Sequence, residues 1–423
     1  MTAPRWYWAF LVVNVALGAF SQLLPLYAYF LGASAGEVGL LAAVGSATNI
    51  VASLFWGKLA DVSPRRRPLV LLGFWGISAC YALLAFLTRR SALFPLNAGA
   101  TFLWMAAGTA ATLLVLTAFP KDRWEREIGR FNAYGGVGWT MGLVLGALWT
   151  TMLTRFVGEG WGLRSLALVV ALIAGVAGLL ALRSLPEPRS SPRRTSFLDW
   201  TSGVGTFVVE RLRYGPTHLV EALNPRQLLR FLQGRTAFGP ELVLCYYGEL
   251  LSFVGFALVF APFPVFLRKN LGWPNEWVFA LYVAHHAIGI FAYEWARRAI
   301  ASWGHRPALA FALLVRVGIF VGFAAVGKGK GAGLLPLLFA LAGITWSFFQ
   351  LATTALVSRL APAELRGQGL GLYNAVAGLG NVIGAALGGY LADGFGYAAP
   401  FLSGAALLFL TLPIFLVESR PPS

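Results

Sequence analysis

Charged side chains are scarce in this chain of 423 residues. Only 12% of the residues are Asp, Glu, Lys or Arg, whereas 58% are apolar. A soluble domain with this composition would lack the polar surface that keeps a protein in water. The composition therefore excludes a soluble protein and predicts an integral membrane protein.

The chain also has few residues of the kinds that bind metals or carry redox chemistry. Its two cysteines, Cys80 and Cys245, fall inside apolar stretches, where a thiol usually behaves as a small buried hydrophobe. Glu294 lies nine residues after the first member of the pair His285-His286, and nine residues do not return to one helix face. We therefore expect no disulfide, metal site or cofactor.

Enzymatic and ATP-dependent functions lack support as well. No phosphate-binding loop of the type G-x-x-x-x-G-K-[ST] occurs, and no pair of residues has the spacing of a nucleophile and its base. We therefore predict no catalytic residues, and neither an enzyme nor a primary ATP-driven pump.

Long apolar stretches occupy most of the chain. A helix needs roughly 20 apolar residues to cross the hydrocarbon core of a membrane. The first stretch is too long for the core of a signal peptide and no small-residue cleavage site follows it, so we expect it to be retained. The predicted fold is an all-α integral membrane protein with twelve transmembrane helices, at residues 7–31, 36–57, 67–88, 92–119, 129–154, 163–183, 240–267, 275–299, 307–326, 334–360, 367–392 and 396–417.

The second half of the chain repeats the first. The pattern G-x-[FY]-N-A-x-x-G-x-G-x-x-x-G-x-x-x-G begins at Gly129 and again at Gly371, an offset of 242 residues. A similar offset, of 239, relates Pro25 to Pro264. Internal repeats in an apolar chain are typical of transporters.

The repeat and the predicted helices divide the chain into three parts. They are an N-terminal six-helix bundle at 1–183, a connection at 184–239 and a C-terminal six-helix bundle at 240–423, with the two bundles pseudo-symmetric. In the connection, apolar residues recur at helical spacing among arginines, which predicts short amphipathic helices on the inner membrane surface. A solvated linker is the alternative.

The net charge of +16 raises the question of nucleic acid binding, which the positions of the basic residues answer. With both termini on one side, 24 of the 33 Lys and Arg residues fall on that side, eight fall on the other, and Arg316 lies within a span. This asymmetry follows the positive-inside rule. It predicts a multi-pass protein of the cytoplasmic (inner) membrane with both termini in the cytoplasm, and it excludes nucleic acid as a partner.

Glycines at every fourth position mark equivalent helices of the two halves. A helix face without side chains allows another backbone to approach closely. Because the spacing recurs in both halves, we expect a moving interface, although static packing would account for it in a single helix. The predicted helix-packing glycines are Gly138, Gly142, Gly146, Gly380, Gly384 and Gly388.

The twelve helices, two halves and long central connection resemble the major facilitator superfamily of transporters, over essentially the whole chain. The most specific local match is G-x-L-A-D from Gly57 to Asp61, followed by Arg65, Arg66 and Arg67. In that family this loop acts as a conformational latch. The resemblance therefore implies this role for Gly57, Asp61, Arg65, Arg66 and Arg67.

The latch assigns a partner to Asp61. The resemblance implies that it faces the start of the eleventh helix, where an acid complements the positive helix end. Val62 and Pro64 depart from the family's motif, and the equivalent loop of the second half has Ala301 near the position of the acid. A basic cytoplasmic loop with an incidental Asp is the alternative.

Two features of the family's proton-coupled drug exporters are missing. Those exporters usually carry an Arg in the fourth helix and end the fifth with G-P-x-x-G-G. This chain has no Arg between Arg90 and Arg123, and Ala147 follows Gly146. The residues therefore do not indicate drug–proton antiport.

The resemblance implies that helices 1, 4, 7 and 10 line a central cavity. Polar residues inside spans usually face a cavity or a partner, because burying them in lipid is costly. In the seventh helix, Tyr246, Glu249 and Phe253 share one face. Glu249 is the main candidate for proton coupling because a buried carboxyl can load and release a proton. An acid paired with a cation for packing is the alternative.

Other polar and aromatic residues complete the candidate substrate cavity. An aromatic ring and an amide one turn apart in the tenth helix suit a neutral, ring-bearing or hydroxylated solute. Asn, Gln and Thr also serve simply as contacts between helices, so both roles stay open. The candidates are Asn14, Gln22, Asn97, Thr101, Tyr246, Phe253, Trp346 and Gln350.

Two basic candidates for coupling lie outside those helices. His286 is one, because imidazole titrates near neutral pH. Arg316, near the middle of the ninth span, either binds an anionic group of the substrate or neutralises Glu249 or Glu294, and we prefer the structural pair. Glu294 itself is expected to pair with Arg298, four residues later.

We therefore predict a secondary transporter that moves a small solute by alternating access, coupled to a proton, with export favoured. Uptake of a sugar-like or other nutrient solute is one alternative. A non-transporting membrane sensor or lipid-handling protein is an alternative of another class. The expected partners are a small-molecule substrate, the lipid bilayer and a coupling proton, and the protein is expected to act as a monomer.

Overall fold

The computed structural model describes residues 4–62, 66–120, 123–186, 239–326, 331–362 and 366–416. The amphipathic helices expected in the central connection lie outside the described residues.

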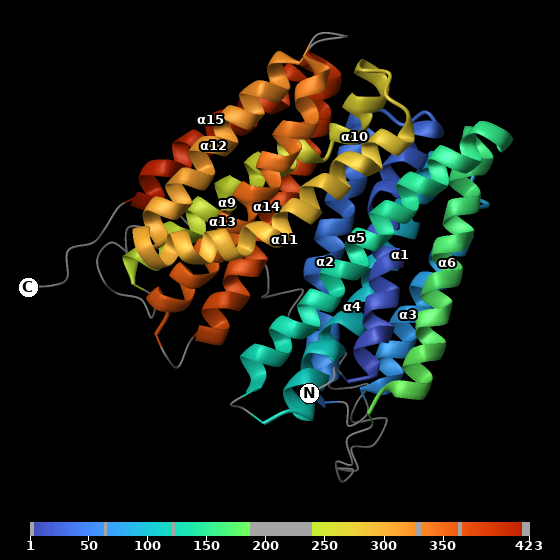
Figure 1. Ribbon diagram of the computed structural model, residues 1–423, viewed down its shortest axis with the longest axis horizontal. Helices are drawn as coiled ribbons and strands as arrows, with labels where there is room; N and C mark the ends of the chain where they lie inside the picture. The colour runs from blue at the N-terminus through green and yellow to red at the C-terminus, as the bar shows by residue number, and fades with distance from the viewer. Residues whose placement is uncertain are drawn as a thin grey trace, which may run out of the picture. The chain divides into compact units, whose positions relative to one another are not determined.

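Long α-helices form almost all of the described chain, which contains no strand (Figure 1). The first half has α1 (Trp6–Phe30), α2 (Ala35–Val62), α3 (Arg67–Leu84), α4 (Leu93–Ala118), α5 (Trp124–Val157) and α6 (Glu159–Ser184). The second half has α9 (Pro240–Phe260), α11 (Asn275–Trp303), α12 (His305–Ala325), α13 (Leu335–Leu360), α14 (Arg366–Phe395) and α15 (Ala398–Leu416). Short helical turns complete the list: η1 (Arg90–Ala92), α10 (Phe263–Val265), η3 (Phe266–Asn270) and η4 (Ala332–Leu334).

These twelve long helices confirm the predicted all-α membrane fold. Eleven helical segments are long and apolar enough to cross a membrane. The exception is α11, which corresponds to the predicted span at 275–299. It carries two histidines and the charged cluster of Glu294, Arg297 and Arg298 along its length, and these polar residues reduce its apolar character.

The predicted span at 240–267 is interrupted in the structure. The helix α9 ends at Phe260 and is followed by a turn, α10 and the π-helical turn η3. Pro262 and Pro264 lie in this stretch, and a proline has no N–H to donate to the preceding helical turn. The span therefore ends as a series of short turns and not as one helix.

The described residues fall into two compact units. Unit 1 consists of Met1–Arg194 with Phe263–Val283, and unit 2 consists of Thr195–Pro262 with Ala284–Ser423. The segment Phe263–Val283 belongs to the second half of the sequence but packs with unit 1. The predicted C-terminal bundle at 240–423 includes this segment. The division of the chain into bundles at 1–183 and 240–423 therefore stays a prediction.

The internal repeat is visible in the way helices pair within each unit. In unit 1, α1 packs on α5 and α6, and α3 packs on α4 and α6. In unit 2, α9 packs on α14 and α15, and α12 packs on α13 and α15. The helices α1 and α9, and likewise α3 and α12, thus have equivalent neighbours in the two units, as expected for a duplicated bundle.

The glycine faces repeat the same contacts in both units. A Cβ atom at Gly138 or Gly142 would collide with the carbonyl oxygens of Leu11 and Val15 on α1. A Cβ at Gly384 would collide in the same way with Val254 on α9, which is the residue 239 positions after Val15. Gly380 and Gly388 contact the same helix. A neighbouring helix backbone therefore lies close to five of the six glycines.

Gly146 is the exception among these glycines. A Cβ there would meet the ring of Phe279 on α11, and not a helix backbone. The expectation of a helix backbone at this position is therefore wrong, because an aromatic ring occupies the space that the missing side chain leaves.

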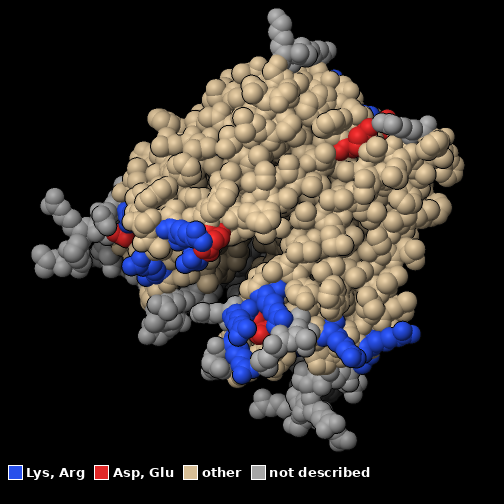
Figure 2. All heavy atoms as spheres, viewed as in Figure 1, with Lys and Arg blue, Asp and Glu red and all other residues tan. Residues whose placement is uncertain are grey.

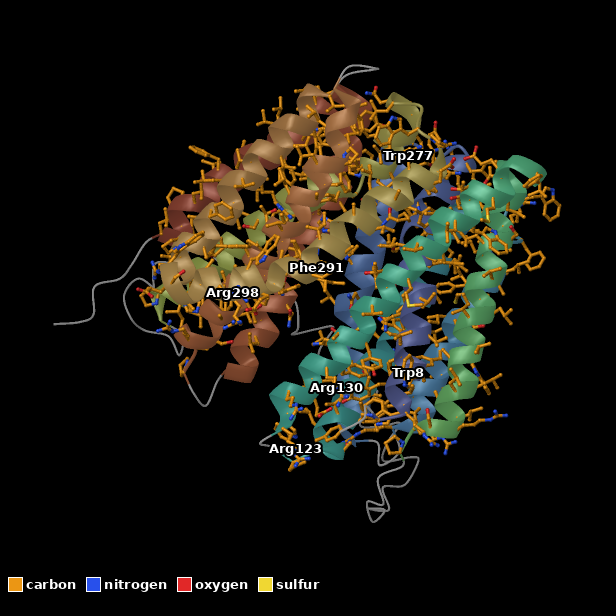
Figure 3. All side chains as sticks on the ribbon, viewed as in Figure 1. Trp8, Arg123, Arg130, Trp277, Phe291 and Arg298 are labelled. Carbon is orange, nitrogen blue, oxygen red and sulfur yellow. The ribbon has the colours of Figure 1, made fainter. Side chains whose placement is uncertain are left out.

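Apolar side chains cover the flanks of the helices, and charges lie at their ends. Trp8, Trp277 and Phe291 are 53%, 52% and 71% exposed (Figure 3). On the face drawn in Figure 2, basic side chains gather in a few clusters and leave most of the surface uncharged. Arg123 and Arg130 lie at the start of α5. This distribution is the one expected for helices surrounded by lipid.

Candidate functional site

Glu249 is a buried carboxyl group without a basic partner among the described residues. It lies in the middle of α9, and the residue is only 1% exposed. Neither carboxylate oxygen has a hydrogen-bond partner among the described residues. The polar group that interacts with this carboxyl group is the hydroxyl of Tyr373, and no basic side chain among the described residues does so. The alternative of an acid paired with a cation for packing therefore has no support in the described part of the chain.

Tyr373 connects Glu249 to further polar residues of unit 2. Its hydroxyl lies 3.0 Å from Oγ1 of Thr353 on α13. The side chain of Thr354 also interacts with this hydroxyl. The amide of Gln350 donates to Oγ1 of Thr354 over 3.5 Å. We call Glu249, Gln350, Thr353, Thr354 and Tyr373 the polar cluster. The structure thus brings two predicted site residues, Glu249 and Gln350, together.

Sequence reasoning missed Tyr373 and the two threonines. A signal for Tyr373 was present, because the repeated motif has Phe131 at the equivalent position, 242 residues earlier. A change from Phe to Tyr adds only a hydroxyl group. The position of Thr353 opposite that hydroxyl depends on how α13 packs on α14, which the sequence does not give.

The first half of the chain has a purely apolar contact where the second half has Glu249 and Tyr373. The offset of 239 between α1 and α9 relates Glu249 to Phe10, and Phe131 is the counterpart of Tyr373. The rings of Phe10 and Phe131 lie 4.9 Å apart at an angle of 67°. Packing at this crossing of two helices therefore does not require an acid.

Tyr246, a predicted cavity residue, makes a contact that both halves share. Its hydroxyl donates to the carbonyl oxygen of Gly369 over 3.1 Å. In the first half the hydroxyl of Tyr7 donates to the carbonyl oxygen of Glu127 over 3.4 Å. The two pairs are related by the same offsets of 239 and 242. This hydrogen bond ties α9 to α14 and indicates a structural role for Tyr246.

Arg316 is fully buried without a carboxylate partner. The residue is 2% exposed, and its Nε donates to Oγ1 of Thr345 over 3.1 Å. Its Nη2 donates to the carbonyl oxygen of Ala342. No carboxyl group among the described residues acts on it. The preferred interpretation, a pair with Glu249 or Glu294, is therefore not what the structure shows.

Glu294 has other partners. It forms ion pairs with Arg298 over 2.8 Å, as predicted from the spacing of four, and with Arg297 over 2.7 Å. The cluster is exposed near the end of α11 (Figure 3). Arg297 and Arg298 thus take the place of Arg316 as the basic partners of Glu294.

Aromatic rings surround the Arg316 guanidinium. Its central carbon lies 4.7 Å from the ring centre of Phe256, and 5.9 Å from those of Phe260 and Trp346. Phe253, a predicted cavity residue, has its ring centre 6.0 Å from that of Trp346. The predicted residues Phe253 and Trp346 are thus together in one aromatic group of α9 and α13.

His286 lies on α11, directly after His285, whose ring centre is 6.2 Å from that of Phe260 in this group. The ring centre of His286 is 5.2 Å from that of His285, and the charge of Arg316 acts on His285. The Nδ1 atom of His285 is buried without a hydrogen-bond partner among the described residues. Sequence reasoning named His286 as a coupling candidate and considered His285 only as part of a metal cluster, which its spacing from Glu294 argues against.

The four candidates on α1 and α4 make mostly local contacts. Asn14 donates to the carbonyl oxygen of Phe10 over 2.7 Å, and Asn97 donates to that of Leu41 on α2 over 2.9 Å. The side chain of Gln22 is buried, with Oε1 unpartnered among the described residues. Thr101 is half-buried. The contact of Asn97 is the helix-to-helix role that was the alternative to cavity lining.

The predicted latch is described only in part. Arg65 and the side chain of Asp61 lie outside the described residues, so their predicted roles stay predictions. Arg66 donates to Oγ1 of Thr117 over 2.8 Å, at the end of α4. Arg67 donates to the carbonyl oxygen of Leu182 at the end of α6. Both arginines therefore bind the negative ends of helices in unit 1.

The comparisons with known proteins agree on one family. The family model described as Major Facilitator Superfamily matches residues 6–368 and 331–423. The chain is 22% identical to the multidrug resistance protein MdtG of Proteus mirabilis (strain HI4320) over 429 residues, which covers 99% of this chain and 95% of that protein.

Solved transporter structures are similar in fold. The nucleoside transporter NupG matches with a TM-score of 0.70 and 15% identity, over 98% of this chain and 99% of that one. A bacterial homolog of the human lysosomal transporter Spinster matches with a TM-score of 0.73 and 13% identity, over 98% and 97%. With the family model spanning nearly every residue, the chain belongs to the Major Facilitator Superfamily and is a multi-pass membrane transporter of small molecules, not an enzyme.

Proposed function

We propose that this transporter exports a small solute by alternating access, driven by protons that load and leave at Glu249. It does so as a monomer in the cytoplasmic membrane, with both termini in the cytoplasm. The similarity to a protein named for multidrug resistance supports export. The excess of Lys and Arg on the side of the termini supports the orientation.

The isolation of Glu249 is the observation that carries the proposal of proton coupling. A buried carboxylate without a counterion is costly, and protonation removes that cost. Among the described residues, the Tyr373 hydroxyl is the polar group that interacts with Glu249, and the ring of the counterpart Phe10 supports the view that packing at this position does not need an acid. Loading a proton therefore stabilises the closed packing of α9, and exposure to water allows the proton to leave.

The glycine faces support movement of helices against each other. The backbones of α5 and α14 lie directly on α1 and α9, without intervening side chains. Such smooth contacts allow one helix to shift along another with few changes of rotamer. In this proposal Gly57, Asp61 and Arg65 to Arg67 form the latch that holds one of the alternating states.

The test is proton movement driven by solute in proteoliposomes. Wild-type protein is reconstituted with pyranine inside, and fluorescein, rhodamine 6G and thymidine are added in turn as an anionic, a cationic and a neutral probe. A solute that the protein transports should change the internal pH. In Glu249→Gln the pH change should disappear, while exchange of labelled solute at equal concentrations on both sides should persist.

Glu127→Gln is the matched control. Glu127 is the other described acid that is buried within a helix, at 7% exposure, but it accepts a hydrogen bond from Tyr7 over 3.2 Å. Its substitution should leave proton movement intact. Proton movement that survives in Glu249→Gln would overturn coupling through this residue, and the absence of solute movement in either direction would overturn the export proposal.

A further inference from the structure

We propose that Arg316 binds the acidic group of the transported solute, so that the substrate is an organic anion with a flat apolar body. The inference rests on the proposed function, because it names the class of solute that the transporter moves. Four observations on unit 2 support it.

The first observation is an uncompensated charge. Arg316 is 2% exposed, and no described residue forms an ion pair with it. Basic side chains inside a membrane span are costly and normally pair with an acid or mark a functional site. The acid nearest along α9, Glu249, lies seven residues before Phe256, which is roughly 10 Å along the helix axis. Arg316 therefore lacks a counterion that a bound anion would supply.

The second observation is a guanidinium held in place with a donor left over. Nε and Nη2 are fixed by Thr345 and the carbonyl of Ala342 on α13. Both of these hydrogen bonds are made by Nε and Nη2, and neither uses Nη1. A planar guanidinium with a fixed orientation and a free N–H group is suited to bind a carboxylate or a similar oxyanion.

The third observation is a set of aromatic rings around the charge. The guanidinium lies over Phe256, Phe260 and Trp346. Phe260 and Trp346 are only half-buried, as is Phe253 beside Trp346. Aromatic faces bind flat apolar groups by stacking. When the acidic group of the solute binds Arg316, the flat body of the solute therefore lies against these rings.

The fourth observation comes from the internal repeat. The offset of 239 relates Arg316 on α12 to Ile77 on α3, and Ile77 is fully buried. The first half therefore packs the equivalent helices with an aliphatic side chain. An arginine that served packing alone would be a poor replacement, since a buried charge is far more costly than a methyl group. His285 also interacts with the charge of Arg316. It is a basic residue, so it does not neutralise Arg316 and does not compete with a bound anion.

The experiment compares two ligands that differ in charge but hardly in shape. Binding of 2-naphthoate and of the neutral 2-naphthamide to detergent-purified protein is measured at pH 7.5 by quenching of tryptophan fluorescence and by the shift of the thermal unfolding midpoint. Wild-type protein should bind 2-naphthoate at least about tenfold more tightly, as expected for a charge-assisted hydrogen bond. Arg316→Gln should lose this preference, and Arg316→Lys should keep part of it.

Two further variants make the outcome specific. Arg298→Gln removes an exposed basic residue of the same unit and should keep the full preference. Glu249→Gln should keep the preference while it abolishes proton movement, so that failure of coupling and failure of anion binding are separate results. If Arg316→Gln does not fold, the wild-type preference and its partial retention in Arg316→Lys decide the question.

Three results would overturn the proposal. They are the absence of 2-naphthoate binding to wild-type protein, equal affinity for the acid and the amide, and a preference that persists in Arg316→Gln. Binding of 2-naphthoate without any proton movement would contradict the coupling at Glu249 and leave the role of Arg316 standing.

Discussion

At the scale of single residues, the two halves of this transporter differ where function is expected to lie. The second half has Glu249 and Arg316 where the first has Phe10 and Ile77. All four side chains are buried. Since the apolar pair shows what packing alone requires, the two charges are additions to the packing. A duplicated chain thus contains its own reference for deciding which buried polar residues are structural.

The same comparison gives Tyr246 a structural role, which leads to a prediction. Its hydrogen bond to Gly369 is repeated by Tyr7 in the first half. Tyr246→Phe should reduce the free energy of unfolding by about 1 kcal/mol, because it removes one buried hydrogen bond between α9 and α14. Thermal unfolding in detergent would measure the change.

The neighbouring residue provides the control for this substitution. The hydroxyl of Tyr247 is buried and has no hydrogen-bond partner among the described residues. Tyr247→Phe should therefore leave the unfolding midpoint unchanged or raise it. Equal destabilisation by the two substitutions would contradict the structural role of the Tyr246 hydroxyl.

At the scale of helices, glycines bring the backbone of α5 onto α1 and the backbone of α14 onto α9. Gly142 and Gly384 each lie against a carbonyl oxygen, of Val15 and Val254. Because these contacts involve backbone atoms, a neighbouring side chain cannot rotate to make room. A methyl group at either glycine must therefore push the two helices apart.

Gly384→Ala should consequently destabilise the protein by about 1–3 kcal/mol, the usual effect of overpacking. Gly371→Ala, in the same helix, has nothing within 4 Å of the added methyl group. That substitution should be neutral or stabilise by about 0.5–1 kcal/mol, since alanine favours a helix more than glycine does. Unfolding midpoints of both variants would test the prediction, and a stable Gly384→Ala protein would contradict the close contact.

At the scale of the whole molecule, one polar contact joins segments that are far apart in the sequence. Oε1 of Glu159, at the start of α6, accepts hydrogen bonds from Arg268 over 2.6 Å and from Asn275 over 2.9 Å. All three residues belong to unit 1. Arg268 and Asn275 flank the connection from η3 to α11, a helix that continues into unit 2.

We predict that η3 and the start of α11 move against α6 during transport, which breaks this contact. With Cys80 and Cys245 replaced by Ser, a protein with Glu159→Cys and Arg268→Cys should lose transport when a short bifunctional thiol reagent links the two positions. A reducible reagent should allow transport to recover on reduction. The measurement is solute exchange in proteoliposomes before linking, after linking and after reduction.

A second cysteine pair controls for modification as such. Glu294→Cys with Arg298→Cys places both thiols on one helix, four residues apart. Linking that pair should not stop transport, because no movement between helices is needed across it. Undiminished transport by the linked pair at 159 and 268 would contradict opening of this contact.

Much of the fold could be predicted because apolar length and repetition are properties of the sequence. A run of about 20 apolar residues has to satisfy its backbone internally in lipid, and only a helix does so within one segment. The predicted spans therefore agree with the helices to within a few residues at most ends. The span at 240–267 was predicted as one helix, and the prolines at 262 and 264 explain why it is not.

Less of the candidate site could be predicted, because partners across helices depend on rotation and depth. The sequence placed Glu249 and Arg316 inside spans, and it left open whether they neutralise each other. The structure separates them: Arg316 lies among aromatic rings, and Glu249 lies beside Tyr373.

By itself the sequence determined the membrane location, the helical fold, the duplication and the glycine faces, since each follows from composition or spacing along one chain. Only the tertiary structure decided which buried groups meet. It joined Gln350, through Thr354 and Tyr373, to Glu249, and it left Arg316 without an acid. The physical reason is that a buried charge is stabilised by the atoms within a few ångströms of it, and those atoms come from other helices.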